Sequence, residues 1–528
     1  MTAKNLLWIM CDEVRTDALG CYGSPFAQTP HLDRLAQRST LFRNATVQSP
    51  LCVPSRGSFF TGRWAHSLGL LQNDMQLNMY APQRAALEAA IAALPAGEWE
   101  RRVEAQMAEA RCYGEEGYTL GVPEASVRAN AVELARLQLA AELDVDFQGP
   151  RFRLLPEIFA DHGYQTAVFG KVHHNAPRTG FQHSSLSEAT EMQPFGVSTR
   201  WAQDSSGFVM LPLGSILPPV VIGGTCPVPE ERCPDVVSTE QAVEFLRTRV
   251  QEPWVIHVSI IWPHTPVLPP APYDELHAPE RFAVPPPSAE ELRGKSRHEN
   301  VYRGVFSDPR PMTHEESLRA AAHYHGLMSY TDTLVGRLID ALDASPYADD
   351  TAIAFHADHG TLLGEHGLWQ KCTFYEPVAK VPLMIAAPGQ RTGHVVDGMV
   401  QLVDLAPTLL SLCGVQDGER FDGVDLTPQV RGEAESTQRL VFSEVRSFAE
   451  GTRRMVSDGE WRLEADVPAN PVWGHDLTLY NLREDPKEQR NLAEDPRCRE
   501  IAQRLLAELQ DWTATGPAPD PTPAAAAV

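Results

Sequence analysis

The chain has 528 residues, of which 43% are apolar and 22% are charged, a composition typical of a globular protein. The 45 lysines and arginines face 69 aspartates and glutamates, and the formal net charge of -24 argues against nucleic acid or an anionic membrane as a partner. No apolar run approaches the roughly 20 residues that span a membrane, and nine cysteines without a CxxC pair favour a reducing compartment, so we expect a cytoplasmic protein.

Short apolar runs, each followed by ionisable residues, predict buried strands of a mostly parallel sheet. The runs are Asn5–Cys11, Gln165–Phe169, Trp254–Ile261 and Thr351–Phe355. Helical stretches at Ser238–Arg249 and Ser317–Leu342 favour an α/β sheet covered by helices on both faces. The proline-rich segment Pro212–Pro234 is expected to be an ordered loop. Because ligands bind outside the carboxyl ends of such strands, the residues after the runs are candidates for one site.

The remaining segments predict how the chain divides into domains. We expect residues 1–390 to form the large α/β domain and residues 391–515 to form a smaller C-terminal α+β subdomain. Residues 516–528 are rich in proline and alanine and predict a disordered tail. Residues from about 81 to 141 predict an insertion of amphipathic helices, which offers a surface for a homo-oligomer.

The most specific motif is the segment Cys-Val-Pro-Ser-Arg at residues 52–56, followed by Thr-Gly-Arg at residues 61–63. Taken alone, it would be a helix start with an ordinary thiol. It resembles the signature C-x-P-S-R and downstream T-G-R of the formylglycine-dependent sulfatases. These belong to the alkaline phosphatase superfamily, and the similarity extends to iduronate and choline sulfatases and to phosphonate monoester hydrolases. The resemblance covers nearly the whole chain in order, apart from the helical insertion, and implies an alkaline phosphatase-like sheet sandwiched by helices.

The resemblance implies that Cys52 is oxidised to Cα-formylglycine by a formylglycine-generating enzyme during maturation. The hydrate of this aldehyde is a geminal diol, and a divalent cation lowers the pKa of a bound hydroxyl enough for attack on sulfur near neutral pH. The second hydroxyl then expels sulfate and restores the aldehyde, so covalent catalysis proceeds in two easier steps. The expected activity is that of a sulfuric ester hydrolase, which cleaves an organic sulfate monoester to an alcohol and sulfate through a metal-bound formylglycine hydrate.

Asp12 and Glu13 after the first predicted strand, with Asp358 and His359 after the last, match the metal ligands of the family. Carboxylate oxygens fit Ca²⁺ or Mg²⁺, whereas the imidazole of His359 moves the preference toward Mn²⁺. We expect one divalent cation, calcium first, with manganese and magnesium as alternatives. Glu13 stands where aspartate, glutamine or asparagine is usual, and His359 stands where many sulfatases have asparagine. The His359 form resembles phosphonate monoester hydrolases, which leaves the metal and the preferred leaving group open.

Five cationic residues complete the catalytic set that the resemblance implies. Lys171 and His173 lie in a segment that resembles G-K-x-H, which binds the sulfate and the diol and argues against the phosphonate branch. Arg56 orients the diol, His264 matches the histidine near the leaving oxygen, and Lys371 contacts the sulfate and the bridging oxygen. Taken singly, each side chain could serve only in a surface ion pair. Together they provide the local positive charge that an anionic substrate needs on so acidic a protein.

Asn73 follows Cys52 at the separation seen in choline-sulfatase-like and phosphonate-hydrolase-like relatives, where an asparagine contacts the anion, so we expect it to bind substrate. One alternative function is a phosphonate monoester or phosphodiester hydrolase that uses the same site, since a phosphate diester carries one negative charge, as a sulfate monoester does. A second alternative is an inactive binding protein in which Cys52 is not converted. The sequence does not name the alcohol that leaves.

Overall fold

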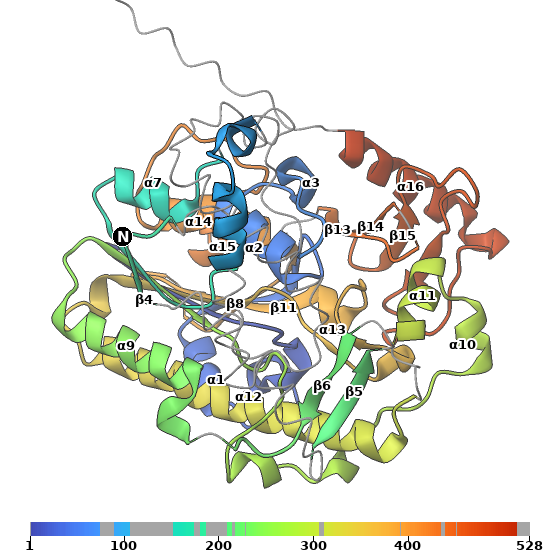
Figure 1. Ribbon diagram of the computed structural model, residues 1–528, viewed down its shortest axis with the longest axis horizontal. Coiled ribbons are helices and arrows are strands. Elements are labelled where there is room, and N and C mark those ends of the chain that lie inside the picture. The colour runs from blue at the N-terminus through green and yellow to red at the C-terminus, as the bar shows by residue number, and fades with distance from the viewer. Residues whose placement is uncertain are drawn as a thin grey trace, which may run out of the picture.

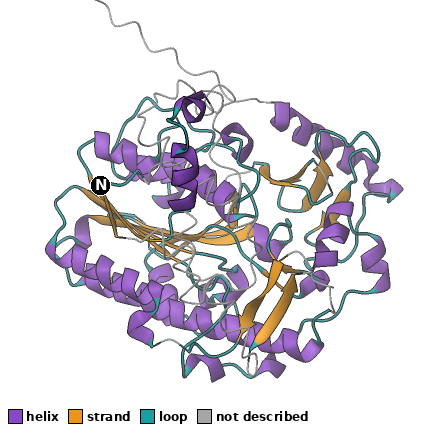
Figure 2. Cartoon of the chain, viewed as in Figure 1, coloured by secondary structure: helices purple, strands orange, loops and turns teal. Residues whose placement is uncertain are grey.

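The computed structural model describes residues 2–73, 89–105, 152–173, 180–185, 208–213, 217–227, 229–305, 311–390, 392–434, 439–449 and 451–514. An eight-stranded mixed sheet forms its centre, helices cover both faces of this sheet, and a four-stranded antiparallel sheet lies in the C-terminal part (Figure 1). Figure 2 shows the same arrangement by secondary structure. The predicted α/β fold with a smaller C-terminal α+β part is confirmed.

The large sheet has the strand order β12-β2-β11-β8-β1-β7-β3-β4. Its strands are β1 (Asn5–Cys11), β2 (Thr40–Thr46), β3 (Gln165–Gly170), β4 (His183–Ser185), β7 (Trp254–Ile260), β8 (Thr351–Ala357), β11 (Lys380–Ala386) and β12 (His394–Gln401). The predicted runs correspond to β1, β3, β7 and β8, which are neighbours at the centre of the sheet and run parallel to one another. β11 runs antiparallel to β2 and β8, which makes the sheet mixed.

Helices on both faces bury the central strands. One face carries α1 (Pro30–Gln37), α9 (Pro234–Thr248) and α12 (His314–Asp343), and the other carries α2 (Cys52–Thr61), α7 (Leu155–Asp161) and α14 (Leu405–Leu412) (Figure 1). Every residue of β1, β7 and β8 is buried, which explains why these strands are continuous apolar runs rather than alternating ones. The ionisable residues Asp12 and Asp358 directly follow the last residues of β1 and β8, at the carboxyl ends of these strands.

The two long helices α9 and α12 begin earlier than the sequence pattern predicts, at Pro234 and His314. Proline suits the first turn of α9 because the N–H that it lacks would have no partner within the helix. In α12 a capping box extends the helix: Thr313 Oγ1 accepts from the N–H of Glu316 at 3.2 Å, and the Glu316 carboxylate accepts from the N–H of Thr313 at 2.8 Å.

The predicted loop at Pro212–Pro234 is wrong in part, because it contains a strand. β5 (Val209–Leu213) and β6 (Leu217–Gly223) pair as a separate antiparallel ribbon. A two-stranded ribbon can accept prolines, since each of its strands has an unpaired side, and an N–H that would point to that side makes no ladder hydrogen bond.

The C-terminal sheet has the order β13-β14-β15-β16. Its strands are β13 (Val441–Arg446), β14 (Thr452–Ser457), β15 (Trp461–Asp466) and β16 (Thr478–Asn481), and α16 (Arg499–Ala514) packs on it. The shorter elements are α3 (Ala65–Leu68), α10 (Ala289–Arg293), α11 (Arg297–Val305), α13 (Glu376–Ala379), α15 (Thr427–Val430), β9 (Leu362–Leu363) and β10 (Trp369–Gln370).

The predicted domain limits stay predictions. β12 at His394–Gln401 follows the expected boundary at residue 390 and still pairs within the large sheet, whereas the C-terminal sheet begins at Val441. Of the predicted helical insertion, only residues 89–105 lie within the described part of the chain, and residues 516–528 lie outside it. Among the described helices, none is both long enough and apolar enough to cross a membrane.

Gly170 ends β3 with a φ of +96°, and a Cβ added there would lie 2.0 Å from the carbonyl oxygen of Ser259. We predict that Gly170→Ala lowers the free energy of unfolding by about 3 kcal/mol, because backbone strain and steric overlap add. Gly163→Ala is the matched control, since its φ is +84° and nothing lies within 4 Å of the added Cβ. Its expected loss is about 1 kcal/mol. Urea denaturation measures both, and equal losses would mean that the approach of β3 to β7 does not require glycine.

Candidate functional site

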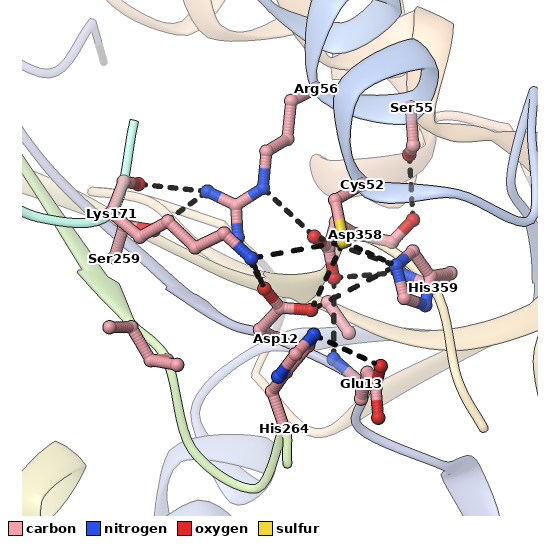
Figure 3. Close-up of polar contacts among 12 residues, drawn as sticks. Asp12, Glu13, Cys52, Ser55, Arg56, Lys171, Ser259, His264, Asp358 and His359 are labelled. Carbon is pink, nitrogen blue, oxygen red and sulfur yellow. Dashed lines mark hydrogen bonds and ion pairs between the residues drawn. The ribbon is translucent and has the colours of Figure 1, made fainter. Parts of the chain in front are cut away.

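The loops after β1, β3, β7 and β8 meet the N-terminus of α2 at one edge of the large sheet (Figure 3). The structure brings together there the predicted residues Asp12, Glu13, Cys52, Arg56, Lys171, His264, Asp358, His359 and Lys371, none of which is more than 8% exposed. So many buried ionisable groups must compensate one another's charge, because an isolated buried charge is very costly.

The sulfur of Cys52 lies at the centre of this cluster (Figure 3). Its Sγ atom is 2.9 Å from Lys371 Nζ, 3.2 Å from His359 Nε2 and 3.8 Å from Lys171 Nζ. Asp12 Oδ1 lies 3.9 Å away. Three basic groups and one carboxylate therefore converge on the side chain of residue 52.

These neighbours change the acidity of the thiol. Burial by itself raises the pKa of Cys52, but Lys171, Lys371 and His359 lower it by more, so the pKa lies well below its ordinary value. A hydrogen bond with His173 acts in the same direction. The pocket therefore stabilises a negative charge at residue 52.

Helix α2 places Cys52 in this field. All ten of its residues are buried, and Ser55 Oγ donates to the carbonyl oxygen of Asp358 at 2.6 Å, which fixes the first turn against the end of β8. Gly62 ends the helix with a φ of +66°. Because Cys52 is the first residue of the helix, it lies at the positive end of the helix dipole, which also favours an anion.

Asp12 and Asp358 project from the ends of the adjacent strands β1 and β8 and share one arginine. Arg56 Nη2 donates to Asp12 Oδ2 at 3.1 Å, and Arg56 Nε donates to Asp358 Oδ2 at 2.9 Å. The pKa of the Asp358 carboxyl is raised, by burial first and by the charge of Asp12 second. Two carboxylates held so close at one point favour a bound cation between them.

The donor atoms suit a divalent cation. Single ligand atoms of Asp12, Cys52, Asp358 and His359 all lie within 4.8 Å of one another. His359 Nδ1 donates to the carbonyl oxygen of Gly360 at 2.8 Å, which directs the lone pair of Nε2 into the group. Hard carboxylate oxygens with one imidazole nitrogen fit calcium, magnesium or manganese.

Glu13 faces a different set of neighbours. It forms a second potential ligand group with Asp12 and His264, and its Oε1 lies 2.8 Å from Lys371 Nζ and 3.4 Å from His264 Nε2. Its backbone has a φ of +63°, a strained conformation of the kind found at functional sites. The role of Glu13 as a metal ligand stays a prediction.

His173 and Asn73 lie at the margin of the cluster. His173 is partly buried, has a φ of +44° and hydrogen-bonds Cys52. Asn73 Oδ1 accepts from the N–H of Val53 at 3.1 Å, so it caps the first turn of α2 beside Cys52. The predicted contact of Asn73 with the anion stays a prediction.

Asp235 on α9 is a supporting residue that the sequence analysis did not find. Its carboxylate accepts from the N–H groups of Ile261 and Trp262 at 2.8 and 2.9 Å, and so anchors the loop that carries His264. Burial raises the pKa of Asp235 to about 6. The only local signal is an acidic residue in the first turn of a helix, which ordinarily indicates a cap.

The chain is similar to known proteins over most of its length. A family model named Sulfatase matches residues 4–95 and 130–415, and a model named N-sulphoglucosamine sulphohydrolase, C-terminal, matches residues 364–515. Iduronate 2-sulfatase of Mus musculus is 27% identical over 91% of this chain and 81% of its own, and choline-sulfatase of Rhizobium meliloti is 27% identical over 97% and 86%. The solved phosphonate monoester hydrolase of Agrobacterium radiobacter is similar in fold, with a TM-score of 0.68 at 20% identity over 97% of this chain and 95% of its own.

The shared arginine generates a stability prediction. Arg56→Met should lower the free energy of unfolding by about 3 to 5 kcal/mol, because Asp358 loses its arginine partner in the buried cluster and Asp12 keeps only Lys171. Arg34→Met is the matched control: Arg34 and its partner Asp340 are 49% and 56% exposed, and loss of such a pair should cost less than about 1 kcal/mol. Urea denaturation in the presence of a chelator measures both. A cost for Arg56→Met no larger than the control would show that the buried pairs do not stabilise the fold.

Proposed function

Because this chain belongs to the sulfatase family of the alkaline phosphatase superfamily, we propose that it hydrolyses an organic sulfate monoester with a formylglycine derived from Cys52. Water is consumed, and an alcohol, sulfate and a proton are released. The observation that carries the proposal is the convergence of Lys171 and Lys371 on the side chain of residue 52, beside the proposed metal ligand His359. A small anion bound there would meet the local positive charge that the acidic chain otherwise lacks.

The surroundings of Cys52 support its conversion. It is the first residue of α2, it begins the C-x-P-S-R motif, and its Sγ lies beside the potential metal ligands. Formylglycine supplies an aldehyde hydrate with two hydroxyls, one suited to attack sulfur and the other to expel sulfate. A formylglycine-generating enzyme is therefore the partner required for maturation.

One divalent cation would be held by Asp12, Asp358 and His359, with Glu13 as the further proposed ligand. Calcium is the first choice, and manganese or magnesium are the alternatives. A cation at this position supplies positive charge that lowers the pKa of a neighbouring hydroxyl and neutralises anionic oxygens.

The cationic side chains have separate proposed roles in binding the anion and in positioning the carboxylates. Lys171 and Lys371, whose Nζ atoms lie 3.8 and 2.9 Å from the sulfur of Cys52, are proposed to hold the sulfate oxygens, with His173 and Asn73 at the margin of the anion. Arg56 directs its donors to the two aspartates, to the carbonyl oxygen of Lys171 and to Ser259 Oγ. We therefore propose that Arg56 holds the two carboxylates in place and that the carboxylates in turn orient the diol.

His264 is proposed to move the proton of the leaving group. Its Nδ1 donates to the carbonyl oxygen of Thr265 at 2.6 Å, so Nε2 is the atom directed toward Glu13 and the cluster. A proton delivered from Nε2 to the departing oxygen would release the substrate as a neutral alcohol.

A phosphonate monoester or phosphodiester hydrolase is the second candidate. His359 and the fold shared with the phosphonate monoester hydrolase favour it, whereas Lys171 and His173 favour sulfate. Without conversion of Cys52 the chain would instead be an inactive binding protein. We also propose a cytoplasmic location, which is supported by the thiol state of the eight cysteines in the described part of the chain. A homo-oligomer surface on the predicted insertion stays a prediction.

We predict that the purified, matured protein hydrolyses sulfate monoesters faster than phosphonate monoesters or phosphodiesters. All substrates in a panel of sugar sulfates, choline sulfate and an aryl sulfate present the same singly charged sulfate group to Lys171 and Lys371. Differences in rate within this panel therefore come from the alcohol that leaves. Comparison of kcat/KM across the three ester classes measures the preference. A preference for phosphonate esters by orders of magnitude would overturn the first choice.

The mass of residue 52 is the control for this experiment. Conversion of the thiol to the aldehyde lowers the mass of the peptide that spans Ser49 to Arg56 by about 18 Da. Cys52→Ala should abolish turnover of every ester class. A native peptide that carries only thiol, in a preparation that nevertheless hydrolyses sulfate esters, would contradict the formylglycine mechanism.

Calcium should stabilise the fold through the buried carboxylates. At a concentration 100 times its dissociation constant, the expected gain is about 2.7 kcal/mol, which a chelator reverses. Asp358→Asn should lose most of this gain because it removes a buried ligand. Asp350→Asn is the control, since Asp350 is 48% exposed and pairs with Lys4 outside the site. An equal response of the two variants in thermal melts would argue against a cation at Asp358.

A further inference from the structure

The segment that carries Lys371 has an unusual backbone. Gln370 and Cys372, on either side of Lys371, have φ angles of +67° and +72°. Residues other than glycine pay roughly 1 to 2 kcal/mol for this conformation. It persists only where surrounding contacts fix it, so the position of the Lys371 ammonium depends on groups that hold this turn.

Two side chains of α11 hold the turn from outside. Tyr302 Oη donates to the carbonyl oxygen of Trp369 at 3.1 Å, and His298 Nε2 donates to the carbonyl oxygen of Cys372 at 2.7 Å. The two side chains lie one helical turn apart, so one of them bonds the backbone before Lys371 and the other bonds it after Lys371. The N–H of Cys372 donates to the carbonyl oxygen of Pro50 at 3.0 Å, which ties the turn to the segment that leads into α2.

The contacts of His298 fix its protonation. Nδ1 accepts a hydrogen bond from the backbone N–H of Phe448 at 3.2 Å, while Nε2 donates to Cys372. A ring that accepts at one nitrogen and donates at the other is neutral and has a single tautomer. In agreement, burial lowers the pKa of His298 to about 4.

Phe448 brings the C-terminal part of the chain into the same arrangement. It follows β13, and its ring stacks on Tyr302 at a centroid distance of 4.6 Å and lies 5.5 Å from the ring of His298. α11 is therefore held between the C-terminal sheet on one side and the Lys371 turn on the other.

We propose that His298 is a positioning residue, which holds the Lys371 ammonium beside residue 52 by fixing the Cys372 carbonyl and which links the C-terminal sheet to the anion pocket through Phe448. The inference rests on the proposed function, in which Lys371 binds the sulfate group. It assigns to a residue outside the pocket an effect on the affinity and turnover of the anion.

A matched pair of substitutions tests the role of Nε2. The amide nitrogen of glutamine reaches the position of Nε2, so His298→Gln keeps the donor to Cys372, whereas the shorter His298→Asn keeps only a group near Nδ1. We expect His298→Asn to lower kcat/KM for the best sulfate ester by about 100-fold, the effect of a displacement of about 1 Å, and His298→Gln to remain within about fivefold of the original enzyme. His475→Ala is the control, since His475 also bonds a backbone carbonyl, that of Asp466, but outside the pocket; it should leave kcat/KM unchanged.

Binding of inorganic sulfate, measured by calorimetry, separates positioning from general support of the fold. If His298 acts through Lys371, His298→Asn should weaken sulfate binding in the original chain and have little further effect in a Lys371→Ala background. Equal weakening in both backgrounds, or equal activity of the asparagine and glutamine variants, would overturn the inference. Circular dichroism shows whether His298→Asn folds. If it does not, the sulfate affinity of His298→Gln decides: an affinity equal to that of the original chain supports the inference, and tenfold weaker binding refutes it. Absence of sulfate ester hydrolysis by the original enzyme would refute the proposed function instead.

Discussion

The structure depends on the mutual compensation of charges that are buried at one edge of the sheet. Asp12 and Asp358 are inaccessible to solvent, and Arg56, equally inaccessible, bonds to both. In a low-dielectric interior neither a carboxylate nor a guanidinium is tolerated alone. The sheet makes the arrangement possible, because four adjacent parallel strands end at the same edge and each delivers one part of the cluster. The site and the core are therefore not separable, and an error in strand register would leave charges without partners.

The same edge concentrates unusual backbone conformations. Glu13, His173, Gln370 and Cys372 all have positive φ angles without being glycine. Each conformation costs energy that the neighbouring contacts must offset. Two of them, Gln370 and Cys372, flank Lys371, whose Nζ atom reaches to 2.9 Å from the sulfur of Cys52. The link from Phe448 through α11 to Lys371 extends this dependence to the C-terminal sheet.

Much of this arrangement could be predicted from the sequence, because the features involved are local. The run Asn5–Cys11 is a strand with those limits, and the runs at β3, β7 and β8 differ from the strands only at their ends. The ionisable residues after these runs do converge, since parallel strands share one edge. The early start of α12 was also present in the sequence, because Thr313 and Glu316 have the spacing of a capping box. Hydrophobic periodicity alone does not indicate this start.

Long-range partners could not be predicted in this way. Asp235 binds backbone groups of Ile261 and Trp262, and His298 binds Cys372 and Phe448. Each contact joins segments that are far apart in the chain, and neither residue belongs to a motif. The strand β6 was missed for a different reason: its prolines indicate a loop, and only its position at an edge makes them compatible with pairing.

The most direct test of the account is X-ray diffraction at the manganese absorption edge from crystals of the matured protein soaked in manganese. The account predicts one strong anomalous peak in contact with the carboxylates of Asp12 and Asp358, with Nε2 of His359 and with the side chain of residue 52. A peak bound elsewhere, with these side chains still paired only with Arg56 and the two lysines, would contradict it.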